Sequence, residues 1–403
     1  MPVPDANGIN NGVLISMSGF NQNKMIKNNA IVQVGPGQTW NDVYTYTSPF
    51  NKGVAGGRFS PVGVGGLLLG GGLPYFASQV GWSCNTVKAY QVVLADSTIV
   101  EATATSNSDL FWALKGGSNN FGIVTRFDME TLDVTDLYGG DTLYNTASYP
   151  AFLNAITEYV SPGGGSEDVK AAILPNIVVT PSTGLVQGSL VAFYNGDNAA
   201  PQALAGFAKI ANNFTDDTIY DSFLSYTNLT NIPAFGARNF RWLFASTAIK
   251  VSNNTVALLD KVFTQPAIQA LQNVTGCGTT LAIQPITKAQ LQAARDAGGD
   301  AIDLDPSLGT FISVLINIDW ENAADDATVN QFARTFISNL DAAATKLGLH
   351  IPFTYLNDAQ SGQEVFQYYG GGSSLPTLKK IQQKYDPKGV FQSLENSGFK
   401  LSN

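Results

Sequence analysis

The sequence predicts an α+β protein with a large antiparallel sheet that helices cover on one face. From about Leu132 onward, helical and strand-like stretches alternate along the chain. Pro181-Ser182-Thr183-Gly184 stands between two strand-like runs and is typical of a hairpin turn. Strand pairs joined by tight turns, with helices between them, indicate an α+β layer. The expected helices are 149–160, 199–212, 256–271, 288–297 and 328–347, and the expected strands are 169–180, 185–194, 243–250, 280–286 and 310–318.

The chain before Leu132 predicts shorter elements separated by turns. Trp40, Val43 and Tyr44 share one side of a helical pattern, and Asn107 or Ser108 can cap a later helix. Asn-Gly and Gly-Pro-Gly turns bound the first strand-like runs. The expected strands are 12–17, 30–34 and a pair within 86–102 that turns at Asp96-Ser97, and the expected helices are 39–46 and 107–115.

Composition limits the classes of function. The 403 residues are 44% hydrophobic and 13% charged, which indicates a folded protein with a large core. A net charge of −9 without any lysine or arginine run argues against nucleic acid and anionic membranes as partners. No apolar stretch approaches the roughly 20 residues that span a bilayer, so we expect a soluble protein.

The cysteines and the histidine argue against a metal site. Two cysteines and one histidine cannot furnish the usual zinc or iron–sulfur ligand sets. Cys84 and Cys277 could form one disulfide or remain as buried thiols, since sequence separation does not give distance. His350 lies in an apolar context without a G-x-S-x-G motif to pair with it, which disfavours a serine hydrolase.

Two glycine-dense runs flank a strand-like segment. The first, KGVAGGRFSPVGVGGLLLGGG, covers residues 52–72, and the second, DLFWALKGGSNNFGIVTR, covers residues 109–126. Because glycine lets a ligand approach the backbone closely, the runs suggest a cradle for a large nucleotide cofactor. Neither run reads G-x-G-x-x-G at a strand-to-helix junction, and no P-loop motif is present. Tight turns are the alternative interpretation.

The exact words of these runs resemble a known family. VGVGGLLLGGG, YQVVLADSTIVEA and NSDLFWALKGGSNNFGIVTRF, followed by Tyr355-Leu356-Asn357-Asp358-Ala359, a YYG at 368–370 and KYDPKGVF at 384–391, resemble the berberine-bridge-enzyme-like FAD-linked oxidases. These belong to the vanillyl-alcohol-oxidase, or PCMH-type, flavoproteins. The resemblance implies a PCMH-type FAD-binding domain and an α+β substrate domain whose antiparallel sheet covers the flavin. The implied division is 1–131 (second FAD subdomain), 132–350 (substrate domain) and 351–403 (return to the FAD domain).

The opening of the chain departs from the resembled family. PVPDANGINNGVLISMSGFN resembles the stretch that follows the histidine to which many members attach the flavin. We therefore expect a FAD domain that is incomplete at its N-terminus. His350 cannot be that histidine by position, and Phe59 stands where bicovalent members carry a cysteine. The resemblance thus implies non-covalent FAD.

The resemblance also assigns cofactor-binding residues. They match the family segments beside the isoalloxazine, the pyrophosphate, the adenine and the polar edge of the flavin. The expected cofactor-binding residues are Val62, Gly63, Val64, Gly65, Gly66, Gly70, Gly71, Gly122, Ile123, Val124 and Asn357.

Tyr355 is the expected catalytic residue. By resemblance its ring faces the substrate, and as a base it would need a pKa well below the usual value of about 10. A buried, hydrogen-bonded core tyrosine is the alternative. Leu73 replaces a second active-site tyrosine of many members, and Asn85 replaces a family aspartate. On the sheet, Arg241, Gln284, Asp319 and Glu321 are polar residues that could face the substrate, although each strand residue can face either side.

The resemblance implies an oxidase. The flavin would take hydride from a small alcohol, sugar or secondary metabolite, and dioxygen would reoxidise it to give hydrogen peroxide. The alternative is a flavin-free cyclase or an inactive shortened homologue in a natural-product pathway. N-x-[ST] sequons at Asn213, Asn228, Asn253 and Asn273 suggest a secreted glycoprotein, although Met1 begins a polar stretch unlike a signal peptide. Oligomeric state has no signal in the sequence.

Overall fold

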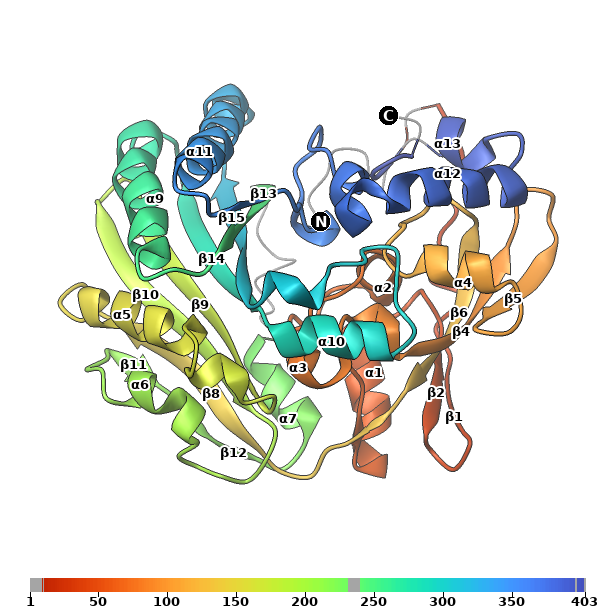
Figure 1. The fold of residues 1–403 in the computed structure, drawn as a ribbon, viewed down its shortest axis with the longest axis horizontal. Helices are drawn as coiled ribbons and strands as arrows, with labels where there is room; N and C mark the ends of the chain where they lie inside the picture. Colours follow the sequence, from red (N-terminus) through yellow and green to blue (C-terminus); the bar gives the residue numbers. More distant parts are fainter. Residues whose placement is uncertain (1–8, 10, 231–239, 396, 402–403) are drawn as a thin grey trace.

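The chain folds around two antiparallel sheets, as a computed structural model describes for residues 9, 11–230, 240–395 and 397–401 (Figure 1). The PVPDANG segment of the expected family resemblance lies outside these residues. The smaller sheet has the strand order β1-β2-β6-β4-β5. Its strands are β1 (Asn23–Ile26), β2 (Ile31–Val34), β4 (Val87–Val93), β5 (Ile99–Thr103) and β6 (Ile123–Glu130), and a short ribbon pairs β3 (Lys52–Gly53) with β7 (Leu132–Asp133).

The larger sheet has the order β11-β8-β10-β9-β14-β15-β13-β16, with β12 beside β8. Every strand pair in it is antiparallel, which confirms the predicted sheet type. Its strands are β8 (Leu137–Tyr144), β9 (Ala171–Thr180), β10 (Leu185–Tyr194), β11 (Phe214–Thr215), β12 (Thr218–Tyr220), β13 (Arg241–Lys250), β14 (Gly278–Ile286), β15 (Phe311–Trp320) and β16 (His350–Ile351).

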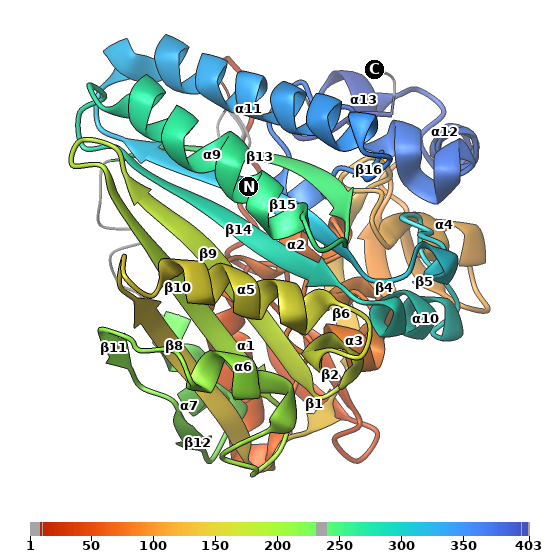
Figure 2. The same cartoon turned by 60° about the vertical axis from the view of Figure 1, so that its left-hand side comes forward.

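Long helices cover one face of the larger sheet, as Figure 2 shows for α5, α9 and α11. Ile312, Val314 and Ile316 alternate along β15 and are fully buried in the core beneath these helices. The opposite face of the sheet contributes Leu174, Phe193 and other residues to a second core that it shares with the smaller sheet. The helices of this half are α5 (Tyr149–Val160), α6 (Ala205–Ala208), α7 (Phe223–Thr227), α9 (Thr255–Leu271), α10 (Lys288–Asp296) and α11 (Asp326–Lys346).

The smaller sheet has helices of its own. The first of them begins at a capping box, in which the Thr39 hydroxyl accepts from the Asp42 N–H and the Asp42 carboxylate accepts from the Thr39 N–H. These helices are α1 (Trp40–Thr47), α2 (Val64–Leu69), α3 (Ala77–Val80), α4 (Ser108–Leu114), α12 (Ser374–Tyr385) and α13 (Val390–Ser393). Short 3₁₀ helices cover Ser48–Phe50, Ser83–Thr86, Gly165–Glu167, Gln202–Leu204, Asn228–Thr230, Pro306–Leu308, Ala323–Asp325, Leu356–Asp358 and Phe366–Gly372.

Most expected elements are present, but two expectations were wrong. Residues 12–17 form no strand, because this apolar run has no neighbouring strand and Val13 is 84% exposed. Only Ala205–Ala208 of the helix expected at 199–212 is α-helical, since the chain then extends toward β11. Strand β8 was missed, because Gly139 and Gly140 interrupt its pattern; a side chain at Gly139 would lie 2.1 Å from the Ala192 carbonyl oxygen.

Two features of the described residues bear on function. No helix in the described ranges is both long enough and apolar enough to cross a membrane. Among the same residues, no three side chains of the His, Cys, Asp or Glu type gather as metal ligands would. Cys84 and Cys277 are both free and buried, so the structure decides the open question of the disulfide in favour of two thiols.

Candidate active site

The first glycine run lies beside α2, and three of its glycines have open surroundings. Among the described residues, a side chain at Gly66 would meet no atom within 4 Å, and at Gly63 the nearest atom would be the Gln38 carbonyl oxygen at 3.9 Å. At Gly65 the nearest atom would be the Pro36 Cβ at 3.5 Å. None of the three has a positive φ. Neither packing nor backbone conformation therefore requires glycine here, which leaves the backbone open to another molecule.

The same stretch offers backbone donors for which the described residues provide no acceptor. Val62 is 40% exposed at the edge of this stretch. Helix α2 begins at Val64, whose N–H donates to the Gln38 carbonyl at 3.0 Å. The N–H groups of Gly65 and Gly66 belong to the first turn, where an α-helix supplies no internal acceptor. Oriented N–H groups on an exposed glycine backbone suit the phosphate oxygens of a dinucleotide.

Gly70, Gly71 and Gly122 are packed tightly by the chain itself. A side chain at Gly70 would lie 2.1 Å from the Asn357 Oδ1, and one at Gly71, where φ is +103°, would lie 2.8 Å from Ile302. At Gly122 it would lie 2.6 Å from the Val92 Cγ1. Internal packing therefore accounts for these three glycines, as the tight-turn alternative holds. Their contact with a cofactor stays a prediction, as it does for Ile123 and Val124, which begin β6.

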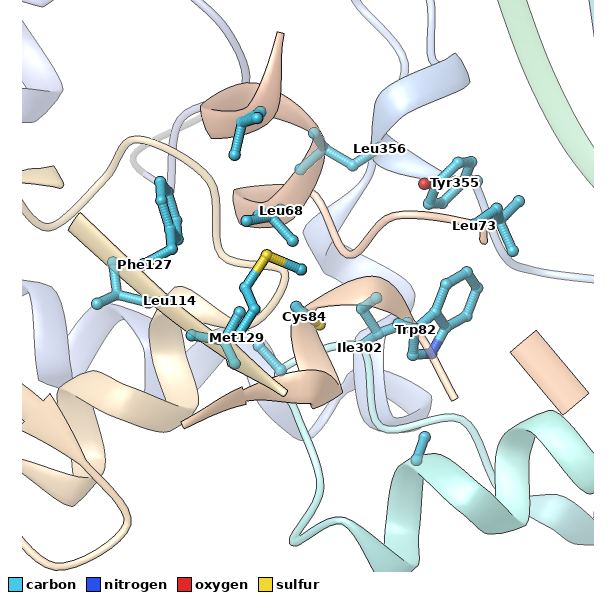
Figure 3. Close-up of a cluster of buried hydrophobic side chains, with 14 of the residues drawn as sticks. Leu68, Leu73, Trp82, Cys84, Leu114, Phe127, Met129, Ile302, Tyr355 and Leu356 are labelled. Carbon is cyan, nitrogen blue, oxygen red and sulfur yellow. The ribbon is translucent and has the colours of Figure 1, made fainter. Parts of the chain in front are cut away.

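Tyr355 lies on a stacked aromatic pair next to the glycine run (Figure 3). Its ring stacks on Trp82 with centroids 5.5 Å apart and planes inclined by 19°. The Asn357 Nδ2 donates to the Tyr355 hydroxyl at 3.0 Å and to the Leu67 carbonyl at 3.1 Å. Leu73 lies beside both rings in the same view. The structure thus brings together Tyr355, Asn357 and the glycine run, which are almost three hundred residues apart in sequence.

The protonation of Tyr355 differs from what a base would need. Burial raises the pKa of Tyr355 above its usual value, and the nearby Asp358 carboxylate raises it further. The Asn357 hydrogen bond and the charge of Arg58 oppose this shift. Tyr355 therefore keeps its proton near neutral pH in this environment, and its role as a base stays a prediction.

Three polar side chains from three distant segments form a hydrogen-bonded network, in which Gln284 and Asp358 are buried and Arg58 is half-buried. The Arg58 guanidinium, in the glycine run, donates to the Gln284 Oε1 on β14. The Gln284 Nε2 donates in turn to the Asp358 Oδ2 at 2.7 Å. Burial raises the pKa of the Asp358 carboxyl, and the Gln284 hydrogen bond and the Arg58 charge counteract it. This network of Arg58, Gln284 and Asp358 links the glycine run, the sheet and the Tyr355 segment, and fixes their relative positions.

Arg58 and Asp358 were not predicted to belong to the site. Arg58 is the one cation between Gly53 and Val87, a signal that was present in the sequence. Asp358 directly follows Asn357, but nothing local marks it as buried. Trp82 was also missed, because its stacking on Tyr355 depends on two segments meeting in the fold.

Asn85, the departure from the family aspartate, has a defined role. Its Oδ1 accepts from the Trp82 N–H at 2.7 Å, and its Nδ2 donates to the Asp300 Oδ2 at 2.8 Å. Asp300 is buried and its other oxygen accepts from the Ile302 and Asp303 N–H groups. A carboxylate from a distant loop thus stands next to Asn85, and the pair holds the backbone of Trp82.

The other polar residues of the sheet divide between its faces. Gln284 points toward the glycine run, as its partners show. Arg241 pairs with Asp326 of α11 at 2.5 Å and lies over the Trp320 ring, so it belongs to the helix-covered side. Asp319 shares the strand face of Ser313, on the side of Gln284. Glu321 follows the end of β15, where its N–H donates to the Thr275 carbonyl.

His350 lies on the opposite side of the larger sheet from the glycine run. Its Nε2 is 3.5 Å from the Asp341 Oδ1 on α11. Phe59 packs at the edge of the core between the sheets. Two observations show that the residues present fit FAD. The backbone at Gly63, Gly65 and Gly66 is accessible although the packing of the described residues does not require glycine there, and the Trp82, Tyr355 and Asn357 side chains lie beside this run.

Comparison with known proteins agrees with this geometry. Residues 3–103 match the FAD binding domain family. The chain is 41% identical over 409 residues to the FAD-dependent monooxygenase prx3 of Penicillium roqueforti, covering 100% of this chain and 80% of that protein. The chain belongs to the PCMH-type FAD-linked flavoproteins. As a member, it is an FAD-dependent oxidoreductase, and FAD is its cofactor.

Solved structures of flavoproteins share the fold. 6-Hydroxy-D-nicotine oxidase from Arthrobacter nicotinovorans superposes with a TM-score of 0.71 at 17% identity, covering 92% of this chain and 79% of that one. Xylooligosaccharide oxidase from Myceliophthora thermophila C1, solved in complex with xylobiose, gives a TM-score of 0.71 at 19% identity, covering 94% and 80%. The predicted PCMH-type fold with a large antiparallel sheet is therefore confirmed.

Proposed function

We propose that this flavoprotein oxidises an alcohol, sugar or secondary-metabolite substrate, with dioxygen as the final electron acceptor and hydrogen peroxide as product. The observation that carries the proposal is that Asn357, which donates to the Tyr355 hydroxyl, also donates to the carbonyl of Leu67, the residue that follows the open Gly66. Oxidation of an alcohol to a carbonyl compound removes one hydride and one proton. Bound FAD supplies the acceptor for the hydride, and the proton must pass to a protein group or to water.

The chain's own residues would position the substrate and handle its proton. Tyr355, fixed by Trp82 and Asn357, would hold the substrate hydroxyl by a hydrogen bond. For Tyr355 to accept the proton, its raised pKa requires either alkaline pH or a closer approach of Arg58, whose charge lowers that pKa. Gly63, Gly65 and Gly66 would hold the cofactor non-covalently through backbone N–H groups.

An absorption spectrum of the purified chain tests cofactor binding first. Flavin bands that pass into the supernatant after acid precipitation would support non-covalent FAD. Bands that stay with the pellet would contradict it. A chain that remains colourless after incubation with excess FAD would favour the flavin-free cyclase or inactive homologue instead.

A monooxygenase is a second candidate, since the relative from Penicillium roqueforti carries that name. The two functions differ in the fate of dioxygen. An oxidase releases one hydrogen peroxide for each substrate oxidised and places no oxygen atom from dioxygen in the product. A monooxygenase transfers one atom of ¹⁸O₂ to the product and reduces the other to water. Mass spectrometry of the product under ¹⁸O₂, with a parallel peroxide assay, separates the two.

We also propose that the chain is secreted and glycosylated. The asparagines of all four sequons, Asn213, Asn228, Asn253 and Asn273, are exposed. Expression through a eukaryotic secretory pathway, followed by enzymatic deglycosylation, should lower the mass of the chain. An unchanged mass would contradict the proposal.

A further inference from the structure

A small polar cavity opens between the glycine run, β9, β14 and α10. Its volume is about 30 Å³, and its wall includes Arg58, Leu73, Tyr75, Gln284, Thr287 and Gln290. A water molecule requires roughly 10–15 Å³ of such space, so the cavity holds about two non-hydrogen atoms. Arg58 and Gln284 belong to the hydrogen-bonded network that includes Asp358, and Leu73 lies beside Tyr355 (Figure 3). The cavity therefore adjoins the candidate active site.

Gln290 is the unusual residue of this wall. It is only 1% exposed, yet neither its Oε1 nor its Nε2 has a hydrogen-bond partner among the described residues. Leaving a buried amide unpaired costs about 1–3 kcal/mol for each group, so native proteins seldom retain one without a ligand or water. The Tyr75 hydroxyl, which lies near the Tyr226 hydroxyl, is a second buried polar atom of the wall.

The backbone of Gln290 is held firmly, so the amide is presented by a rigid support. The Thr287 hydroxyl caps α10 by accepting from the Gln290 N–H at 3.0 Å. The same hydroxyl lies 2.8 Å from the Ser78 hydroxyl at the start of α3. This arrangement ties α10 to α3 at the cavity.

We propose that this cavity is a subsite that recognises a hydroxyl group of the substrate. This hydroxyl group is not on the carbon atom that is oxidised. A primary amide presents one donor and one acceptor side by side. A hydroxyl satisfies both with a single oxygen atom, whereas a carbonyl or ether oxygen would leave the Gln290 Oε1 unpaired. The volume admits one such substituent and excludes a sugar ring. The inference rests on the proposed function only in taking the ligand to be the substrate.

Calorimetric titration of the full chain with phenol and with anisole tests the subsite, because the two probes differ by the hydroxyl hydrogen and a methyl group. The ring of either probe would lie outside the cavity, in the adjoining candidate active site, and only its substituent would enter. We expect phenol to bind about tenfold more tightly than anisole, which corresponds to one satisfied hydrogen bond. Gln290→Leu should abolish this preference, and Tyr75→Phe should reduce it. Gln292→Leu, an exposed glutamine on the same helix, should leave it unchanged. Equal affinities for the two probes, or a preference that survives Gln290→Leu, would overturn the proposal.

Thermal denaturation separates recognition from a structural role. Because the amide is unpaired without ligand, Gln290→Leu should raise the melting temperature of the free chain. If two ordered waters complete a structural network instead, the same variant should lower the melting temperature and leave the probe preference intact, which would also overturn the proposal. Both measurements are made with and without added FAD. A colourless chain that still prefers phenol would therefore contradict the proposed oxidase and support the subsite. A chain that binds FAD but shows no preference for phenol would support the oxidase and overturn the subsite.

Discussion

The two faces of the larger sheet differ in how completely their polar atoms are hydrogen-bonded. On the helix-covered face, β15 contributes Ile312, Val314 and Ile316, all fully buried in an aliphatic core. On the opposite face the same strand carries Ser313 and Asn317, whose Oγ and Oδ1 atoms are buried without a partner in the described chain. One strand thus serves an aliphatic core on one side and, on the other, a face that combines core residues such as Phe311 with unpaired polar atoms.

The difference separates stability from binding. Aliphatic burial stabilises the fold by roughly 25 cal/mol for each Å² removed from water. Unpaired polar atoms lower stability, and their retention on the face toward the glycine run is typical of a surface that meets a ligand. The helix-covered face should therefore dominate stability, and the other face should dominate function.

Substitutions on β15 test this division directly and have the largest expected effect. Ile316→Ala should lower the free energy of unfolding by about 3–4 kcal/mol, because it leaves a cavity in a packed core. Ser313→Ala, three residues away, should leave that free energy unchanged or raise it by up to about 1 kcal/mol, because it removes an unpaired hydroxyl. Urea denaturation of both variants provides the measurement. Equal losses would mean that the two faces contribute alike to stability.

Tyr355→Phe tests the polar face through the residue that lies against it. The variant should lower kcat about 100-fold, the lower end of the usual range for a proton-transferring group. FAD affinity should be unchanged, since the ring still stacks on Trp82. Because the pKa of Tyr355 is raised, kcat/KM of the wild type should rise into the alkaline range if Tyr355 is the base, and that rise should vanish in the variant. Tyr368→Phe, at an exposed position, is the control. A pH profile shared by wild type and Tyr355→Phe would exclude the base role.

Gly66→Ala sharpens the comparison on the cofactor side. The new methyl group would meet no atom of the described residues within 4 Å, so stability should hold or rise slightly in helical backbone. FAD should bind about tenfold more weakly, a difference of about 1.4 kcal/mol, because the methyl group occupies space meant for the cofactor. Gly206→Ala, an exposed glycine of α6, should show the same stability change with unaltered FAD affinity. Fluorescence titration with FAD measures the affinity of both variants. Unchanged affinity in Gly66→Ala would remove this glycine from the site.

Asp141→Asn has the smallest expected effect and tests an ionised group on the polar side. Burial first, then Asp216 and Asp217, raises the pKa of Asp141 to about 6, and its Oδ1 has no partner among the described residues. The folded chain therefore binds this proton more tightly than the unfolded chain. Stability from this group is present below pH 4 and is lost as the pH rises through 6.

The asparagine variant removes that loss. At pH 7 it should be more stable by about 1 kcal/mol, a value reduced for the screening of a partly exposed carboxylate. Below pH 4 the two proteins should unfold alike. Thermal melts at both pH values provide the test, and an equal gain at both would show that ionisation is not its cause.

Much of the architecture was predictable because its signals are local. The strands at 185–194 and 243–250 and the helix at 149–160 follow from periodicity, and the Thr39 cap follows from its neighbours. Segments that depend on a partner were not predictable. The apolar run at 12–17 reads as a strand but pairs with none, and β8 pairs despite its glycines. Pairing is a long-range property that alternation alone does not encode.

The sequence by itself determined the family, the cofactor and the sheet-with-helices plan, because short motifs and residue periodicity carry them. It also placed Tyr355 and Asn357 near the site through their resemblance to family positions. Only the tertiary structure decided which glycines are open and that Arg58, Gln284 and Asp358 form one hydrogen-bonded network. It also decided that Arg241 lies on the helix-covered face of the larger sheet. It also revealed the unpaired amide of Gln290. These properties arise from contacts between segments tens to hundreds of residues apart, and burial and hydrogen bonding exist only once those segments have met.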